Sequence, residues 1–416
     1  MLQLLCNIGL TRHHRQDVPQ YYSFGHDDAS PLFDKTLHTP MNDLVSLMFC
    51  GIGDARNFYA TITAINNYES EVADVAKRRY HFTLVDLKPA ALGRNLIMLA
   101  LLTDLAEVDP KENTALVILA TIFYTFACSI MPLYAYERLQ TAISKVIATL
   151  NCTTPMSNWI WLSSADKLSL ANVLKQWQTE VPEEYPCSEL RSLAVEQNRK
   201  TRLRKMMTRV GDPETNFDLY APAPCKRELA CFQSTGLLFP PGDLLAQFEP
   251  ELLTLVTNYE AKKRTQVDHD ITKYLDSNWK PNVTMVDLDW EMGRDDLGDL
   301  DVGFNPFELG QRLYKNSGVG APSRVDRLFD FAVPFFANVA AGIKRIHDRT
   351  TLEIICGEMT DVLERIRHGL LEHRKEKAPV PAPQARKSRR SGYDSPPNVK
   401  TELPTRYDRI HMSNIP

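Results

Sequence analysis

A short apolar run that leads into a glycine turn constrains the fold more than any other feature of this chain. The run covers Leu44–Cys50, and the sequence Gly51-Ile52-Gly53-Asp54 follows it directly. A continuous apolar run of this length is typical of a strand that is buried on both faces of a parallel sheet. Glycines after such a strand allow the backbone to approach a ligand closely, and the following helix presents unpaired N–H groups to it. The pattern predicts an α/β fold with a ligand site at this turn.

A second strand and helix strengthen this prediction. Residues 80–86 form another apolar run that ends in Asp86, and Pro89 then begins a segment with leucines at helical spacing. In nucleotide-binding sheets, an acid at the tip of the second strand accepts hydrogen bonds from ribose hydroxyls. Gly51, Gly53 and Asp86 are therefore candidates for cofactor binding. Asp54 joins them because the start of a helix favours a carboxylate.

Two departures from the nucleotide-binding pattern argue against catalysis at this turn. Arg56 occupies the position of the third small residue in a full G-x-G-x-x-G motif. Phe49 and Cys50 stand where methyltransferase-type turns are preceded by an acid. The alternative interpretation is a glycine turn and a surface aspartate that bind no ligand.

The alternation of strand and helix returns near the end of the chain. Residues 351–358 predict a third strand, and residues 407–416 predict a further strand that runs into a loop. Glu358 would lie at the end of the third strand, where a nucleoside base is held, and is a further candidate for cofactor binding. The runs that we expect to form one parallel sheet are residues 44–50, 81–86, 352–356 and 408–412.

Asn414 and Pro416 are the candidates for a catalytic role. The tripeptide Asn414-Ile415-Pro416 is similar to the Asn-x-Pro of amino-group methyltransferases, in which amide and carbonyl oxygens hold the target nitrogen. The alternative is a loop without a chemical role. Methyltransferase-like sheets continue beyond their fourth strand, so a chain that stops at Pro416 is expected to be an incomplete version of a longer protein.

The strand and helix patterns divide the chain into five segments. The two outer parts of the sheet are separated by a large, mainly helical insertion, and a basic, proline-rich segment that cannot bury enough apolar surface to order itself precedes the last strand. The segments are residues 1–110 (first part of a Rossmann-like domain), 111–328 (insertion), 329–374 (return to that domain), 375–404 (disordered loop) and 405–416 (further strand and loop).

Composition excludes several classes of function. A net charge of -4 and a pI near 6.2 argue against a general nucleic-acid binder, because such surfaces need an excess of Lys and Arg. The eight cysteines are scattered and include no pair or Cys/His cluster at zinc spacing, so no metal site is expected. They are typical of the reduced thiols of a cytoplasmic protein.

One uncharged stretch is long enough to be considered as a membrane span. It begins at Thr114 and ends at Tyr136. Thr, Tyr, Cys and Pro132 interrupt it, and long buried helices have the same composition. We expect a buried core helix that begins after Asp109-Pro110 and continues into the amphipathic run at residues 136–150.

Several blocks resemble an uncharacterised domain family of fungal proteins, some of which carry MYND zinc fingers. A related domain opens the dynein axonemal assembly factor 3 proteins. The blocks that carry the resemblance are Tyr22-Ser23-Phe24-Gly25, Phe49-Cys50-Gly51-Ile52-Gly53-Asp54-Ala55-Arg56-Asn57, Val85-Asp86-Leu87-Lys88-Pro89, Gly93-Arg94-Asn95 and the segment from Tyr407 to Pro416. The resemblance implies a class I methyltransferase-like Rossmann fold without an established activity, and its dynein branch implies a cytoplasmic assembly role with protein partners. This chain has no MYND-type cluster.

Two functions follow from these expectations. The first is a non-catalytic assembly or scaffold protein that keeps a methyltransferase-like core. The second is an active methyltransferase that acts on an amino group with S-adenosylmethionine as its cofactor, supported by Asp86 and Asn414-Ile415-Pro416. A membrane anchor at residues 114–136 is a third and weaker alternative.

Overall fold

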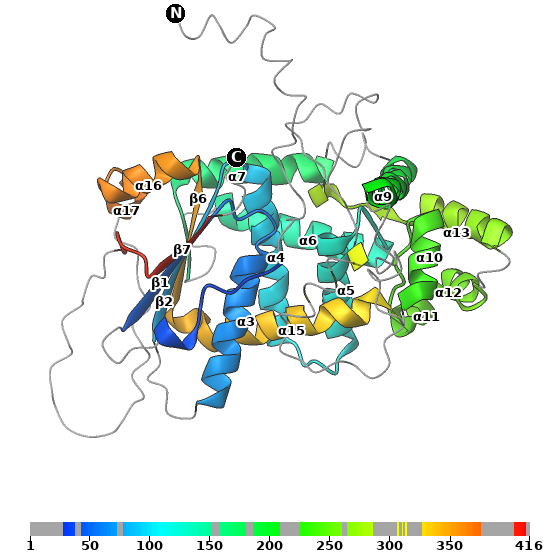
Figure 1. Cartoon of the computed structure of the whole chain (residues 1–416), viewed down its shortest axis with the longest axis horizontal. Helices are drawn as coiled ribbons and strands as arrows, with labels where there is room; N and C mark the ends of the chain where they lie inside the picture. The colour runs from blue at the N-terminus through cyan, green and yellow to red at the C-terminus, as the bar shows by residue number, and fades with distance from the viewer. Residues whose placement is uncertain are drawn as a thin grey trace, which may run out of the picture.

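A five-stranded parallel sheet lies at one end of the protein (Figure 1). The computed structural model describes residues 28–37, 43–72, 78–151, 159–179, 186–208, 225–259, 264–285, 306–307, 310, 313, 327–375 and 403–412. The strands of the sheet are β1 (Leu44–Cys50), β2 (Arg79–Asp86), β4 (Ile160–Leu162), β6 (Thr350–Cys356) and β7 (Arg409–Met412). Their order is β4-β6-β2-β1-β7, and every neighbouring pair is parallel.

The prediction of a single sheet from four distant runs is confirmed. The four runs are β1, β2, β6 and β7, and β2 pairs with β6 along the whole length from Tyr80 to Asp86 although the two strands are far apart in sequence. On one side of β1 the sheet continues with β2 and then β6, and β7 lies on the other side of β1. The strand order therefore reverses between β1 and β7. The carboxyl end of β1 lies at this reversal point.

The fifth strand, β4, was not predicted from the sequence. β4 lies within residues 111–328, the segment predicted as a helical insertion, and it pairs with the outer edge of β6. It is only three residues long, so it shows too few alternations for its sequence to reveal a strand.

Most of the remaining described residues form helices. The helices between β1 and β4 are α3 (Arg56–Glu71), α4 (Pro89–Glu107), α5 (Asn113–Ala127) and α6 (Leu133–Asn151). Those between β4 and β6 are α7 (Ser164–Thr179), α9 (Cys187–Thr208), α10 (Lys226–Thr235), α11 (Gly242–Phe248), α12 (Pro250–Thr257), α13 (Arg264–Asn278) and α15 (Leu328–Ile346), and α16 (Met359–Arg367) and α17 (Glu372–Lys375) follow β6. Strands β3 (Ile130–Met131) and β5 (Lys280–Pro281) form a separate antiparallel pair.

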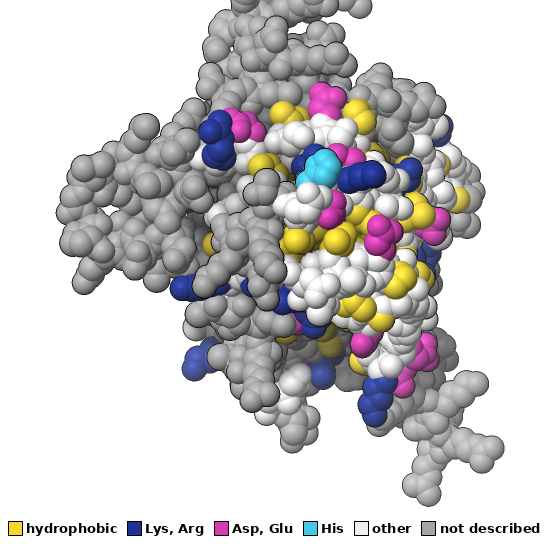
Figure 2. All heavy atoms as spheres, turned by 90° about the vertical axis from the view of Figure 1, so that its right-hand side faces the viewer, with side chains coloured by type: hydrophobic (Ala, Val, Ile, Leu, Met, Phe, Trp, Pro, Cys, Tyr) yellow, Lys and Arg dark blue, Asp and Glu magenta, His cyan; other side chains and the backbone are white. Residues whose placement is uncertain are grey.

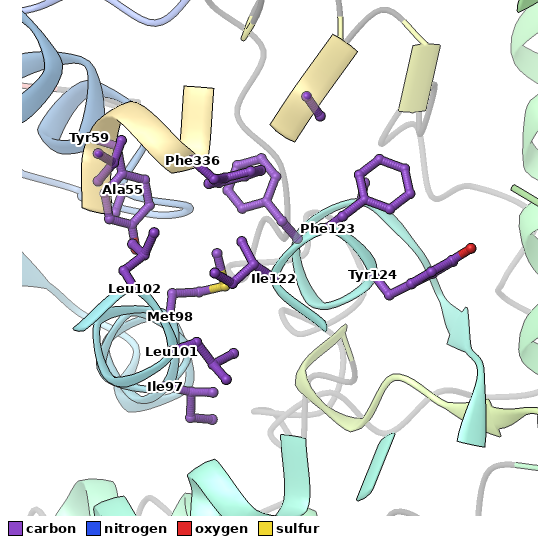
Figure 3. Packing of buried hydrophobic residues seen from close by; sticks show 14 of the residues in the cluster. Ala55, Tyr59, Ile97, Met98, Leu101, Leu102, Ile122, Phe123, Tyr124 and Phe336 are labelled. Atoms are coloured by element: carbon purple, nitrogen blue, oxygen red, sulfur yellow. The ribbon is translucent and has the colours of Figure 1, made fainter. Parts of the chain in front are cut away.

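The main hydrophobic core lies between one face of the sheet and α3, α4 and α15. Phe49, Phe82 and Ile354 project from this face and are fully buried. Helix α4 runs through the centre and contacts α5, α6, α7 and α15. Figure 3 shows its apolar side chains facing residues of α3, α5 and α15. Apolar side chains lie on all sides of α4, as expected of a helix that is surrounded by other helices.

The uncharged stretch at residues 114–136 is not one helix, so the predicted continuous core helix is wrong. It consists of α5, the short strand β3 and the start of α6. The break is stabilised by two buried side chains that cap the carbonyls at the end of α5. The Arg94 guanidinium donates to the carbonyls of Thr125 and Phe126, at 2.9 Å each, and the Asn282 amide donates to that of Cys128, at 2.7 Å. A positive side chain also complements the helix dipole at this end.

The described residues contain one helix that is long and apolar enough to cross a membrane, and it is α4 rather than the stretch at residues 114–136. In α4, 72% of the apolar stretch is buried inside the protein. Its apolar surface is therefore used by the core.

The opposite face of the sheet carries a smaller core that is covered by α16 and α17 (Figure 1). A buried polar network adjoins it. The Glu353 carboxylate is fully buried and accepts hydrogen bonds from Thr83 at 2.9 Å and from Nε of Arg374 at 2.8 Å, and it lies 2.8 Å from the ring of His373. Hydrogen bonds with His373, His81 and Arg374 hold the pKa of Glu353 well below its ordinary value, against the opposing effect of burial. Arg374 also donates to the hydroxyl of Tyr407, at 2.6 Å, which joins the segment before β7 to the network.

Several predictions fall outside the described residues. The basic loop predicted at residues 375–404 is described only at its two ends, and Asn414 and Pro416 lie beyond the last described residue. Among the cysteines of the described residues, Cys50, Cys128, Cys187 and Cys231 are free and buried, and Cys356 is free and half-buried.

Candidate functional site

The glycine turn after β1 has the left-handed backbone that its sequence predicts. Gly51 and Gly53 have φ values of 66° and 50°, and Ala55 also adopts a positive φ of 58°. Glycine adopts this conformation without strain, whereas alanine does so at a cost. The N–H groups of Gly51 and Ile52 both donate to the carbonyl of Val85, at 2.9 and 3.1 Å. The turn is therefore attached to the end of β2.

The Asp86 carboxylate completes this attachment. Its Oδ2 accepts the N–H of Gly53 at 3.0 Å, and its Oδ1 accepts the N–H of Lys88 at 2.9 Å, just before α4 begins. Burial raises the pKa of Asp86 above its ordinary value, and these N–H donors partly oppose the shift by favouring the charged form. The residue is half-buried, and each carboxylate oxygen has a second lone pair. Asp86 therefore joins Gly51 and Gly53 at the edge of the sheet, with two of its acceptor positions already used.

Asp54 lies inside the protein rather than at the surface of this edge. It is 4% exposed, accepts the N–H of Arg56 at 3.2 Å and lies 3.7 Å from the guanidinium of the same residue. Arg56 is equally buried. The two residues form an interior ion pair at the start of α3, which gives Arg56 a structural reason to occupy the position of a small residue.

Glu358 follows the third predicted strand, as expected, but its carboxylate caps a helix. It accepts the N–H of Asp361 at 2.9 Å and the hydroxyl of Thr360, and it is exposed. The hydrogen bond from Thr360 is the main reason that the pKa of Glu358 is lowered. This is the usual role of an acid at the first position before a helix.

Asp166 is a buried acid at the same edge that the sequence did not reveal. It lies near the start of α7, where its Oδ1 accepts the N–H of Cys356 at 3.2 Å and its Oδ2 accepts the hydroxyl of Ser163 at 2.6 Å. Since it is 8% exposed, it stabilises the end of β6 from the interior. The residue follows β4, which the sequence analysis missed.

A contact between α3 and β7 was also missed. The amide of Asn57 lies 2.8 Å from Nε2 of His411, and its oxygen accepts the N–H of Ser30 at 2.8 Å. The next residue, Met412, pairs with Cys50 and is 51% exposed. The chain therefore leaves β7 directly beside the glycine turn, and the predicted catalytic residues Asn414 and Pro416 lie beyond the described part.

The described residues contain no group of three or more His, Cys, Asp or Glu side chains that could hold a metal ion. The edge of the sheet at β1 and β2 presents the glycine turn, the half-buried carboxylate of Asp86 and the exposed side chain of Leu87.

The fold and this edge define an α/β protein with a parallel sheet and a glycine turn at the point where the strand order reverses. Residues 23–128 match the family model of a domain of unknown function, DUF4470. The matched region contains the turn, Asp86 and all of α4 and α5. No curated protein and no solved structure matches the chain.

Proposed function

We propose that this protein is a methyltransferase-like, non-catalytic assembly or scaffold protein. The order β6-β2-β1-β7 supports the methyltransferase-like part, because open α/β sheets of this kind bind ligands at the carboxyl ends of the strands where the order reverses. The observation that carries the non-catalytic part is the bonding of Asp86 to the N–H groups of Gly53 and Lys88.

The bonds of Asp86 bear on catalysis because they occupy two of the acceptor positions that a nucleoside could use. A ribose that replaced either N–H donor would leave a backbone group without a partner, at a cost of about 1–3 kcal/mol. The N–H groups of Gly51 and Ile52 are likewise used by Val85. These contacts support a turn whose role is to join β1, β2 and α4.

The assembly role rests on the resemblance to fungal proteins and to dynein axonemal assembly factor 3, and it implies cytoplasmic protein partners. The surface at the far end of the protein is compatible with such partners. On the described part of the face that α10, α11, α12 and α13 form, acidic, basic and apolar side chains are intermixed (Figure 2). A surface that binds nucleic acid would instead gather positive charge.

The second candidate is an S-adenosylmethionine-dependent methyltransferase that acts on an amino group. Asp86 favours it, because the residue is half-buried at the reversal point and keeps further lone pairs for ribose hydroxyls. Asn414 and Pro416 would supply the amine-binding oxygens in this case.

Calorimetric titration of the protein with S-adenosylmethionine and S-adenosylhomocysteine distinguishes the two candidates. We expect no heat of binding at millimolar ligand. Binding that is weakened by Asp86→Asn, but not by Asp348→Asn, would replace the scaffold proposal with the enzyme. Asp348 is a suitable control because it is an exposed carboxylate at the opposite end of β6.

A further inference from the structure

A buried carboxylate in the helical insertion lacks a counter-charge. Glu249 lies between α11 and α12 and is 5% exposed. Its Oε1 accepts the indole N–H of Trp279 at 2.7 Å and the hydroxyl of Tyr274 at 3.4 Å. Its Oε2 is buried and accepts no hydrogen bond, and no Lys, Arg or His of the described residues forms an ion pair with it.

Three other buried acids of the described residues are satisfied. Glu353 is paired with Arg374, and Asp54 with Arg56. Glu228 forms no ion pair with the described residues, but its two oxygens accept the N–H groups of Phe239 and Leu328, both at 2.6 Å. Since buried carboxylates are normally paired or fully hydrogen-bonded, the free oxygen of Glu249 indicates a missing donor.

Aromatic side chains contact this carboxylate or lie near it. The hydroxyl of Tyr134, from the start of α6, is also buried without a hydrogen-bond partner. Burial, together with the charge of nearby Glu249, raises the pKa of Tyr134 above its ordinary value. Trp279 contacts Tyr124 edge to face, with ring centroids 5.5 Å apart, and Figure 3 shows Tyr124 pointing away from α4. Aromatic rings around a carboxylate are a favourable environment for an organic cation.

Phe248 gives this interior group a connection to solvent. It is 43% exposed and stacks on Tyr134, with ring centroids 4.9 Å apart and an interplanar angle of 27°. Phe248 is also the residue directly before Glu249 in the sequence. Phe248 is therefore the exposed side chain beside both residues.

We propose that Glu249 and Tyr134 form a binding site for a primary ammonium group, which enters past Phe248. An ammonium group has three N–H donors and a positive charge. It would supply the hydrogen bond that Oε2 of Glu249 lacks, donate to the Tyr134 oxygen and neutralise the carboxylate. The ammonium belongs either to a free amine or to a lysine side chain of a protein partner. The inference is independent of the proposed function, since it depends only on residues of the insertion.

The test uses butylammonium, which has the length of a lysine side chain, and butan-1-ol as its uncharged counterpart. The indole N–H resonance of Trp279 reports on the site, because this group donates directly to Glu249. It is assigned by its loss in Trp279→Phe. We expect butylammonium to shift this resonance in a saturable manner and butan-1-ol to leave it in place. Equal shifts with the two compounds would overturn the proposal.

Variants define which residues bind the cation. Glu249→Gln removes the charge and should raise the dissociation constant at least about tenfold, as expected for a charge-assisted hydrogen bond. Glu251→Gln, an equal change of charge at an exposed position of α12, should not alter it. Unchanged binding in Glu249→Gln would refute the site. If that variant does not fold, Tyr134→Phe decides the matter, because it keeps the ring under Phe248 and removes only the hydroxyl.

The source of the ammonium is determined with a second ligand, Nα-acetyl-lysine amide, which presents the same group from a peptide backbone. Binding as tight as that of butylammonium indicates a lysine of a partner protein. Binding of butylammonium without binding of the peptide-linked lysine indicates a free amine. Absence of binding by both ligands overturns the proposal.

Discussion

The Asp86 carboxylate accepts hydrogen bonds from two backbone N–H groups, so the residue stabilises the turn. We predict that Asp86→Ala lowers the free energy of unfolding by roughly 2–3 kcal/mol, because it leaves the N–H groups of Gly53 and Lys88 without their charged acceptor. Urea unfolding of the apo protein measures this. Asp348→Asn should change the free energy by less than about 0.5 kcal/mol, as expected at an exposed position. An unchanged urea midpoint in Asp86→Ala would show that the turn does not depend on this carboxylate.

Gly53 tests the turn through its backbone alone. A Cβ at this position would meet only the carbonyl of Gly51, at 4.0 Å, so Gly53→Ala introduces no collision. We predict a loss of about 1 kcal/mol, which is the cost of the left-handed conformation at a φ of 50°. Gly369→Ala is a matched comparison, because Gly369 has a φ of 64° and open space around it. A much larger loss at Gly53 would indicate a contact that the backbone conformation does not explain.

Glu249 gives the protein a specific dependence on pH. Burial raises the pKa of Glu249 to about 7, from an ordinary value of 4.5. Between pH 4.5 and about pH 7, Glu249 keeps its proton in the folded protein and loses it in the unfolded chain. The group therefore stabilises the fold at low pH. Its contribution is lost as the pH rises through about 7, and amounts to ~3 kcal/mol at most.

Glu249→Gln should therefore become more stable relative to the wild type as the pH is raised from about 5 to about 8. Urea unfolding at the two pH values measures the difference, in a phosphate buffer because amine buffers would occupy the proposed ammonium site. Burial also raises the pKa of Glu228, to about 8, but that residue is present in both proteins and cancels in the comparison. A difference that does not change with pH would contradict the prediction.

At the scale of elements, β7 depends on side chains that were not apparent from its sequence. Tyr407 precedes this strand, and its hydroxyl contacts Thr83 at 2.9 Å and Arg374 at 2.6 Å. We predict that Tyr407→Phe accelerates amide hydrogen exchange in β7 about fivefold, equivalent to one hydrogen bond of about 1 kcal/mol. The amides of β2, in the centre of the sheet, should be unaffected.

Tyr59→Phe provides the control for this prediction. The Tyr59 hydroxyl is buried in the main core and has no hydrogen-bond partner, so its removal should not loosen any strand. Faster exchange of β7 in both variants would mean that the sheet responds to any loss of a tyrosine hydroxyl. Faster exchange in Tyr407→Phe alone would confirm that the buried network holds this edge strand.

The whole molecule shows which parts of a fold a sequence can reveal. β7 was predicted to join the sheet although it is an edge strand that is only partly buried. Continuous apolar runs predicted β1, β2 and β6, because burial on both faces leaves a clear local pattern. The glycine turn and Asp86 were found for the same reason. The strand β4 and the break after α5 were missed, since the first is too short and the second depends on Arg94 and Asn282, which reach it from other elements.

The contacts of the candidate site were the least predictable part. Asn57 meets His411, and Asp166 meets Cys356, across sequence separations of 354 and 190 residues. No local pattern encodes such pairs. Glu358 was placed correctly at the end of a strand, but whether its carboxylate faces a ligand or its own helix depends on the local backbone, which caps α16.

The continuity of the main core leads to a prediction for unfolding. A single hydrophobic cluster includes Phe49 of β1 and Leu275 of α13, so the sheet and the insertion share one interior. Leu275 is fully buried, and Leu275→Ala should cost about 2–5 kcal/mol. Because the core is shared, this loss should lower the stability of the sheet as well.

Pulse alkylation in urea measures both regions in one experiment, through the buried thiols of Cys50 in β1 and Cys231 in α10. The two thiols should become reactive at the same urea concentration, and Leu275→Ala should shift both midpoints equally. Reaction of Cys231 at lower urea, with Cys50 still protected, would show that the insertion unfolds on its own.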